Sequence, residues 1–241
     1  MLPRATPEDC LRLAMAARTP RSRGLYARRG LAARSRLDRT THAMLLRQLY
    51  LAHFEVERFE LALEVAKQAL ELEVLPDVLA QDAARAALAA GLLDEGLVHL
   101  RRAARSGPAA RRPFHQWTLG SALFLAGRYR EATAAFERAA RWGTTDKPLF
   151  RAHLALARLS AGEPQPNLTQ TFSELVAAPC GQGYGRFVLG QLAYAMGDWT
   201  EARRYLEAFL KRSEGGRPSL AIALRGELEV ARSTLAKMRA N

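Results

Sequence analysis

The feature that most constrains the fold of this chain is an internal repeat. Five segments align on one turn residue each, at intervals of 34, 36, 35 and 35 residues: Glu57, Gly91, Gly127, Gly162 and Gly197. Four of the five are Gly, which ends a helix in the left-handed conformation without a steric penalty. A fixed period of this length is typical of arrays in which each repeat is one supersecondary unit that packs on its neighbours.

The same chemistry recurs on both sides of each turn. Two residues after it stands an apolar or aromatic side chain: Phe59, Leu93, Tyr129, Pro164 and Trp199. Five residues after it, four units have a small residue: Ala62, Gly96, Ala132 and Ala202. Seven residues before it stand Tyr50, Ala84, Gly120, Ala155 and Gly190. Small residues on facing sides let two helices approach closely. We therefore predict that each unit is a helix, a short turn and a second, antiparallel helix.

This pattern resembles the tetratricopeptide repeat, which has a 34-residue period and a similar order of small and aromatic positions. The third unit matches best, at Leu119, Gly120, Gly127, Tyr129, Ala132, Phe136 and Ala139. The fifth is nearly as good, at Leu189, Gly190, Gly197, Trp199, Ala202 and Leu206. The fourth is degenerate, and we expect its second helix to begin near Asn167, an N-cap residue with Gln170 three residues on. The resemblance implies an all-α helix-hairpin solenoid with about five repeats.

The two ends of the chain differ from the repeats, as expected of capping units. We predict an Arg-rich N-terminal capping hairpin over residues 1–39, a repeat array over 40–213 and a C-terminal capping helix over 214–241. The hairpin has helix starts at Thr6-Pro7 and Thr19-Pro20, and Pro218 suits the first turn of the last helix. One face of that helix carries Leu220, Leu224, Leu228, Ala231, Leu235 and Met238. We expect this stripe to cover the last apolar face of the array; dimerisation with a second copy is the alternative.

The charge is strongly positive, with 36 Lys and Arg against 24 Asp and Glu. Residues 1–39 hold ten Arg against three acidic residues, and we define a basic patch there: Arg21, Arg23, Arg28, Arg29, Arg34 and Arg36. Such a patch attracts nucleic acid or an anionic surface, or it only keeps an Ala- and Leu-rich array soluble. Few aromatic residues lie among these arginines, which counts against recognition of a single nucleic-acid strand.

The sequence favours a cytoplasmic protein. No stretch approaches the roughly 20 apolar residues of a membrane span. Pro3, Glu8 and Asp9 stand where a signal peptide needs its apolar core. Cys10 and Cys180 are the only cysteines, which indicates neither a disulfide framework nor a metal-finger spacing.

Catalytic motifs are missing from the sequence. The histidines are scattered and form no metalloprotease motif, and we expect His99 and His153 at helix surfaces or turns. Gly181-Gln-Gly-Tyr-Gly185 lacks the Lys and the preceding strand of a phosphate-binding loop. We therefore predict no catalytic residues, no metal site and no cofactor.

The resemblance implies that the first helices of the hairpins line a concave groove that binds an extended peptide or a helix. The groove residues that it implies are Arg47, Gln81, Arg85, Phe114, Trp117, Ser121, Tyr184, Phe187 and Gln191. Trp117 and Phe187 depart from the family pattern, in which the aromatic residue falls one position earlier. Two interpretations remain open: both rings are anchors in the groove, or both belong to the core.

The groove lacks the family's clamp for a terminal carboxylate, since Arg47 is accompanied by Leu51, and Phe114 by Thr118. We predict a non-catalytic interaction scaffold or adaptor that binds a protein or peptide segment, amphipathic with acidic residues. Binding of nucleic acid or an anionic surface through the Arg-rich N-terminal region is the alternative.

Overall fold

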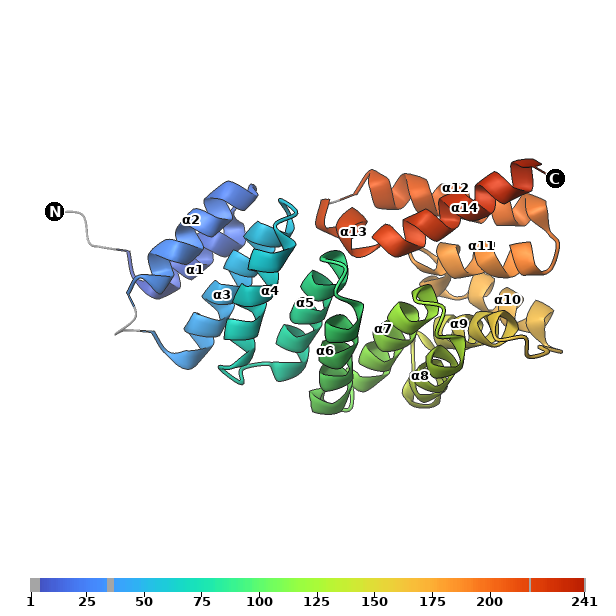
Figure 1. Ribbon diagram of the computed structural model, residues 1–241, viewed down its shortest axis with the longest axis horizontal. Coiled ribbons are helices and arrows are strands. Elements are labelled where there is room, and N and C mark those ends of the chain that lie inside the picture. The colour runs from blue at the N-terminus through green and yellow to red at the C-terminus, as the bar shows by residue number, and fades with distance from the viewer. Residues whose placement is uncertain (1–4, 34–36, 217, 241) are drawn as a thin grey trace. The chain divides into compact units, whose positions relative to one another are not determined.

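The computed structural model describes residues 5–33, 37–216 and 218–240, and within them the chain is helical throughout (Figure 1). Fourteen α-helices and one short 3₁₀ helix, η2 (Pro179–Gly181), lie in these residues, with no strand among them. Contacts divide the chain into two compact units, Met1–Gly107 and Pro108–Asn241, called unit 1 and unit 2 below. The predicted all-α class is confirmed.

Unit 1 consists of three helix hairpins. They pair α1 (Pro7–Ala16) with α2 (Pro20–Leu31), α3 (Arg39–Phe54) with α4 (Phe59–Leu70), and α5 (Pro76–Ala89) with α6 (Leu93–Ser106). The first hairpin begins where the sequence predicts. The Thr6 side chain accepts from the Asp9 N–H while Asp9 accepts from the Thr6 N–H, a capping box, and Thr19 caps α2.

Unit 2 consists of three hairpins and two further helices. The hairpins pair α7 (Arg112–Leu125) with α8 (Tyr129–Trp142), α9 (Lys147–Ser160) with α10 (Leu168–Ala177), and α11 (Gly185–Ala195) with α12 (Trp199–Glu214). Helices α13 (Pro218–Ala223) and α14 (Arg225–Ala240) follow. We call the first helix of each repeat hairpin its A helix and the second its B helix; α3, α5, α7, α9 and α11 are the A helices.

All five predicted turn residues adopt the left-handed conformation. The φ angles are 80° at Gly91, 72° at Gly127, 81° at Gly162 and 80° at Gly197, and even Glu57 has φ 58°. After each turn the next backbone N–H donates to the carbonyl five residues earlier, as from Arg128 to Leu123 at 2.9 Å. This bond is the mark of a Schellman motif, which ends each A helix. Four of the B helices begin two residues after the turn residue, whereas α10 begins six residues after Gly162.

The small residues lie where the two helices of a hairpin approach most closely. A Cβ atom on Gly120 of α7 would stand 2.6 Å from the ring of Phe136 on α8. A Cβ atom on Gly190 of α11 would stand 2.5 Å from Leu206 on α12. Both distances are too short for a real Cβ contact, so Gly at these positions is what lets the hairpins close.

Two details of the sequence prediction are wrong. Helix α10 begins at Leu168 with Asn167 at the N-cap position, as predicted, but the Asn167 side chain makes no capping bond, and Gln170 instead donates to Glu174 on the exposed side of that helix. The single C-terminal helix is two helices, because the chain breaks at Leu224 between α13 and α14. Of the predicted stripe, Leu228, Ala231, Leu235 and Met238 are buried, whereas Leu220 on α13 is 43% exposed.

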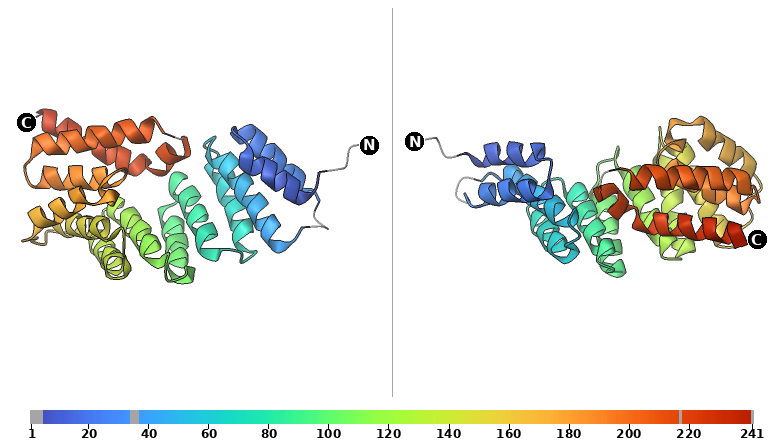
Figure 2. Two further views of the ribbon diagram at one scale, coloured as in Figure 1. Left: turned by 180° about the vertical axis from the view of Figure 1, so that it is seen from behind. Right: turned by 90° about the horizontal axis from the view of Figure 1, so that it is seen from above.

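Helix α14 packs on α11 and α12 of its own chain, and it runs alongside α12 in each view (Figures 1 and 2). Its buried stripe belongs to the core of unit 2, together with Phe187, Leu206 and Phe209. The stripe therefore covers an apolar face of the array, which is the first of the two interpretations of the sequence.

Substituting Gly120 tests the close approach within a hairpin. Gly120→Ala drives a methyl group into the fully buried Phe136 ring, and we expect unit 2 to lose about 1–3 kcal/mol of unfolding free energy. Gly226→Ala is the matched control, since its Cβ would meet only the flexible tip of Leu125, at 3.0 Å. That control should be neutral or gain about 0.5–1 kcal/mol from helix propensity. Urea unfolding measures both, and equal effects would contradict the packing argument.

Candidate partner-binding site

In unit 1, two predicted groove residues converge on one buried carboxylate. Arg47 of α3 donates through Nε to Oδ2 of Asp82 on α5 at 2.6 Å, and Nη1 of Arg85 lies 3.6 Å from Oδ1. Asp82 is 1% exposed, whereas the side chains of Arg47 and Arg85 are 28% and 40% exposed. The carboxylate thus fixes two guanidinium groups at the surface of the A helices, and one positive charge of the three groups is not balanced within the cluster.

Asp82 is not among the residues that the repeat pattern selects, although it organises the others. The signal is present in the sequence, because Asp82 stands three residues before Arg85 and hence on the same helix face. Gln81, the neighbouring residue that the pattern does select, is buried at 6% exposure. The A helices of unit 1 therefore have Arg47 and Arg85 at their surface, whereas Gln81 is buried.

In unit 2, Trp117 of α7 lies in an aromatic cluster with residues of α9 and the start of α11. Its ring meets Tyr184 edge to face, with centroids 4.7 Å apart. Its Nε1–H donates to Nδ1 of His153 at 3.2 Å. Trp117 is half-buried, and the neighbouring ring of Phe114, 5.9 Å away between centroids, is 41% exposed. Phe114 and one side of Trp117 therefore remain at the surface of α7.

Phe187 lies in the core and not in a groove, which agrees with the second of the two interpretations of the sequence. Its side chain is 0% exposed and packs on Phe209 of α12, with ring centroids 5.4 Å apart. A partner cannot reach this ring while unit 2 stays folded. The repeat register places Phe187 on an A helix correctly, but the side of α11 that carries it faces α12.

His153 contradicts the expectation of a surface position. It is 0% exposed and stacks on Phe136, with ring centroids 4.2 Å apart. Burial lowers the pKa of His153 to about 3, so the imidazole is neutral. Since Nδ1 accepts from Trp117, Nε2 carries the proton, and within the described residues this N–H has no hydrogen-bond partner. The ring serves as a core residue that orients Trp117.

Two of the remaining predicted groove residues of unit 2, Tyr184 and Gln191, meet α14. The Tyr184 hydroxyl donates to Oε1 of Glu227 at 3.1 Å, and Nε2 of Gln191 donates to Oγ1 of Thr234 at 3.0 Å. Ser121 is buried, and its hydroxyl donates to the Trp117 carbonyl at 3.0 Å. Helix α14 therefore covers part of the A-helix face of unit 2, a contact that the repeat pattern does not reveal.

The basic patch divides in the structure. Arg21, Arg28 and Arg29 are exposed on α2, whereas Arg23 forms a half-buried ion pair with Glu55 at the end of α3. Arg34 and Arg36 lie outside the described residues. The patch is thus composed, where the structure describes it, of three exposed arginines and one that ties the first hairpin to the second.

Glu227 is the most perturbed carboxyl group of this face. It is 5% exposed, and burial raises its pKa from 4.5 to about 7, against the smaller opposing effects of the hydrogen bonds from its own backbone N–H and from Tyr184. Because the folded state holds this proton more tightly than the unfolded state, the group's contribution to stability is full below pH 4.5. That contribution declines as the pH rises from 4.5 to about 7.

Glu227→Gln isolates this effect, because the amide carbonyl can still accept from Tyr184 but does not titrate. We expect the wild-type unfolding free energy of unit 2 to fall by roughly 3 kcal/mol relative to the variant between these two pH values. Urea unfolding at a series of pH values measures the difference. The same pH dependence in both proteins would show that Glu227 does not titrate in this way.

Comparisons by sequence find no match: no protein-family model fits the chain, and no curated protein resembles it significantly. Comparisons by structure find several helical arrays. Yeast Tom70 aligns with a TM-score of 0.56 and 14% identity over 97% of this chain and 48% of its own, so this chain spans about half of Tom70. MamA aligns with a TM-score of 0.45 and 18% identity, over 72% of this chain and 91% of its own.

YrrB, described as a TPR protein with an unusual peptide-binding site, aligns with a TM-score of 0.44 and 17% identity, over 74% of this chain and 90% of its own. Across the described ranges, no helix is both long and apolar enough to cross a bilayer. The likeness to Tom70, the repeat period and the five left-handed turns agree on one architecture. The chain has the fold of the tetratricopeptide-repeat proteins.

Proposed function

We propose that this protein is a non-catalytic interaction scaffold that binds an acidic, amphipathic segment of a partner protein on the A helices of unit 1. The observation that carries the proposal is the pair of guanidinium groups, Arg47 and Arg85, held at the surface by the buried carboxylate of Asp82. Neither a catalytic base nor a nucleophile is part of this cluster, since its only carboxylate is engaged with both arginines.

The arginines are suited to binding a carboxylate. Each guanidinium has five N–H donors in a planar fork, and the contacts with Asp82 engage only part of them. A carboxylate of the partner would add charge-assisted hydrogen bonds, which are about twice as strong as neutral ones. Because Asp82 already restricts both side chains, less conformational entropy is lost when the partner binds.

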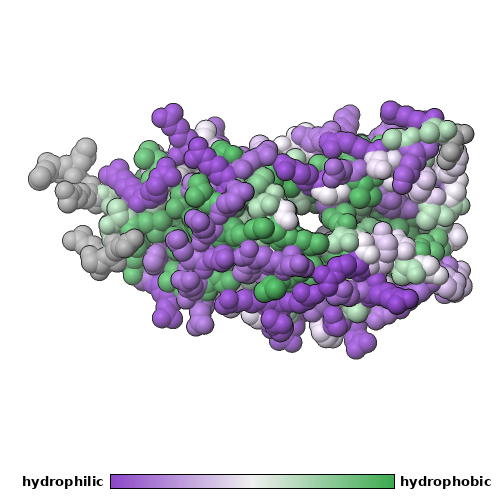
Figure 3. Space-filling model, in the orientation of Figure 1, coloured by the Kyte–Doolittle hydropathy of each residue, from purple (hydrophilic) through white to green (hydrophobic). Residues whose placement is uncertain are grey.

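Apolar surface surrounds the two arginines. Met44 and Leu51 on α3 and Val78 on α5 are half-buried, at positions that the repeat register assigns to the same face as Arg47 and Arg85. Apolar side chains also show between hydrophilic ones on the visible surface of unit 1 (Figure 3). A segment with acidic residues beside an apolar stripe matches this mixture, as in the binding of a helix in a groove. In unit 2, Phe114 and Trp117 offer an aromatic contact on α7.

Selection from a random-peptide display library on the full chain tests the proposal and does not require that the natural partner be identified first. We expect the selected peptides to be rich in Asp and Glu. Arg85→Ala should weaken the best of them about tenfold or more, since a hydrogen bond between charged groups contributes about 1.5–3 kcal/mol. This variant leaves the contact between Arg47 and Asp82 in place.

Arg105→Ala is the matched control, because Arg105 is exposed on the B helix α6 of the same unit. It should bind the selected peptides as the wild type does. Equal losses in the two variants would indicate a general effect of charge, and peptides that tolerate Arg85→Ala would place the binding site elsewhere.

A further inference from the structure

Helix α14 contacts the same side of the repeats in unit 2 that we propose as the partner-binding face in unit 1. Tyr184 and Gln191, which belong to the A-helix positions of the last repeat, both bond to α14. On another A helix, α7, Leu125 lies closest to Gly226 of α14. The helix therefore touches two A helices of unit 2 as well as the B helix α12.

The contacts have the pattern that a bound amphipathic helix would make. Glu227 and Thr234, seven residues apart and so on one side of the helix, accept from Tyr184 and Gln191. Leu228, Ala231, Leu235 and Met238 supply an adjoining apolar stripe. This face of unit 2 thus accommodates a helix that carries a carboxyl group, a hydroxyl group seven residues later and an apolar stripe beside them.

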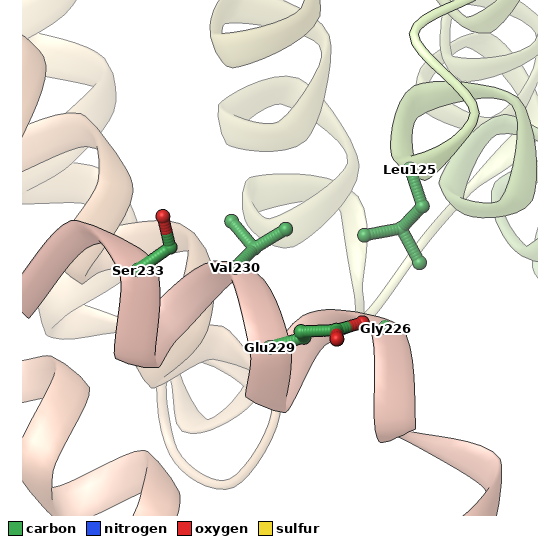
Figure 4. A pocket seen from close by; sticks show the side chains of 5 residues that line it. All are labelled: Leu125, Gly226, Glu229, Val230 and Ser233. Atoms are coloured by element: carbon green, nitrogen blue, oxygen red, sulfur yellow. The ribbon is translucent and has the colours of Figure 1, made fainter.

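The first half of α14 borders an open hollow. Leu125 points toward α14 across an open hollow of about 220 Å³, which is also lined by Gly226, Glu229, Val230 and Ser233 (Figure 4). Helix α13, which leads into α14, buries none of its described residues. Leu228 and Ala231 hold this half together with the buried carboxyl group of Glu227, whose desolvation opposes docking.

We propose that α14 is an internal ligand of unit 2, and that an amphipathic helix with the same spacing of carboxyl, hydroxyl and apolar groups competes with it for this face. The inference extends the proposed function from unit 1 to unit 2. Binding of an external helix displaces α14, beginning at its first half. The chain thereby limits access to one of its partner-binding faces.

Hydrogen exchange in the wild-type protein tests whether α14 opens by itself. Amides of residues 225–233 should exchange about tenfold or more faster than those of α11, because local opening needs less free energy than unfolding of the unit. If the amides of α14 are protected as long as those of α11, the helix is a permanent cap and the proposal is overturned.

A labelled peptide of residues 218–240 tests competition on the full chain. Glu227→Lys places an ammonium group where the carboxyl group of the protein's own α14 binds, so this helix should leave and the variant should bind the wild-type peptide about tenfold tighter than the wild-type protein. Lys237→Glu is the control: a charge change of the same size at an exposed position of α14 outside the hollow, with no effect on affinity.

One result contradicts the proposal: equal affinity of the peptide for a folded Glu227→Lys variant and for the wild type. Circular dichroism shows whether the variant is folded, and the exchange measurement decides if it is not. Both tests concern unit 2 and Glu227, whereas the proposed function depends on Arg85 of unit 1, so one can fail without the other.

Discussion

The left-handed turn between the two helices of each hairpin is the constraint on which the rest of the structure depends. Five turn residues, with φ between 58° and 81°, reverse the chain and bond back to the preceding helix. The register of the two helices is then fixed. The Phe136 side chain consequently packs directly on the backbone of Gly120, and the Leu206 side chain packs directly on the backbone of Gly190. Equivalent positions of the A helices nevertheless differ in burial: Arg47 is partly exposed, whereas Gln81 and Phe187 are buried.

The features that could be predicted from the sequence are those set by the turns and by other groups close together along the chain. The hairpins, their helix starts at Thr6 and Thr19 and the fit of Gly120 follow from short-range rules, because the groups concerned are near in sequence or repeat at a fixed interval. The roles of His153 and Glu227 could not be predicted, since each depends on a residue 36 or 43 positions away. For Asp82 the pairing with Arg85 is visible in the sequence, but the bond to Arg47 spans 35 positions. Phe187 shows the same limit: a repeat register assigns a helix to a residue but not the side of the helix that faces the core.

The same face is used differently in the two units. In unit 1 it carries two arginines on a buried aspartate, an arrangement suited to an acidic partner. In unit 2 it contacts α14, a helix of the chain itself. The Tyr184 hydroxyl donates to the buried carboxyl group of Glu227, and the Gln191 amide donates to Thr234. A partner of unit 1 therefore meets a charged surface, whereas a partner of unit 2 has to replace an apolar stripe and a carboxyl group.

The central claim is that partners bind on the A helices. Nuclear magnetic resonance of the isotope-labelled full chain, titrated with an acidic peptide selected on it, tests this claim most directly. The account predicts that the largest shift changes fall on α3 and α5, around Met44, Arg47, Leu51, Val78 and Arg85. Changes that instead concentrate on the B helices α4 and α6, or on the exposed arginines of α2, would contradict it.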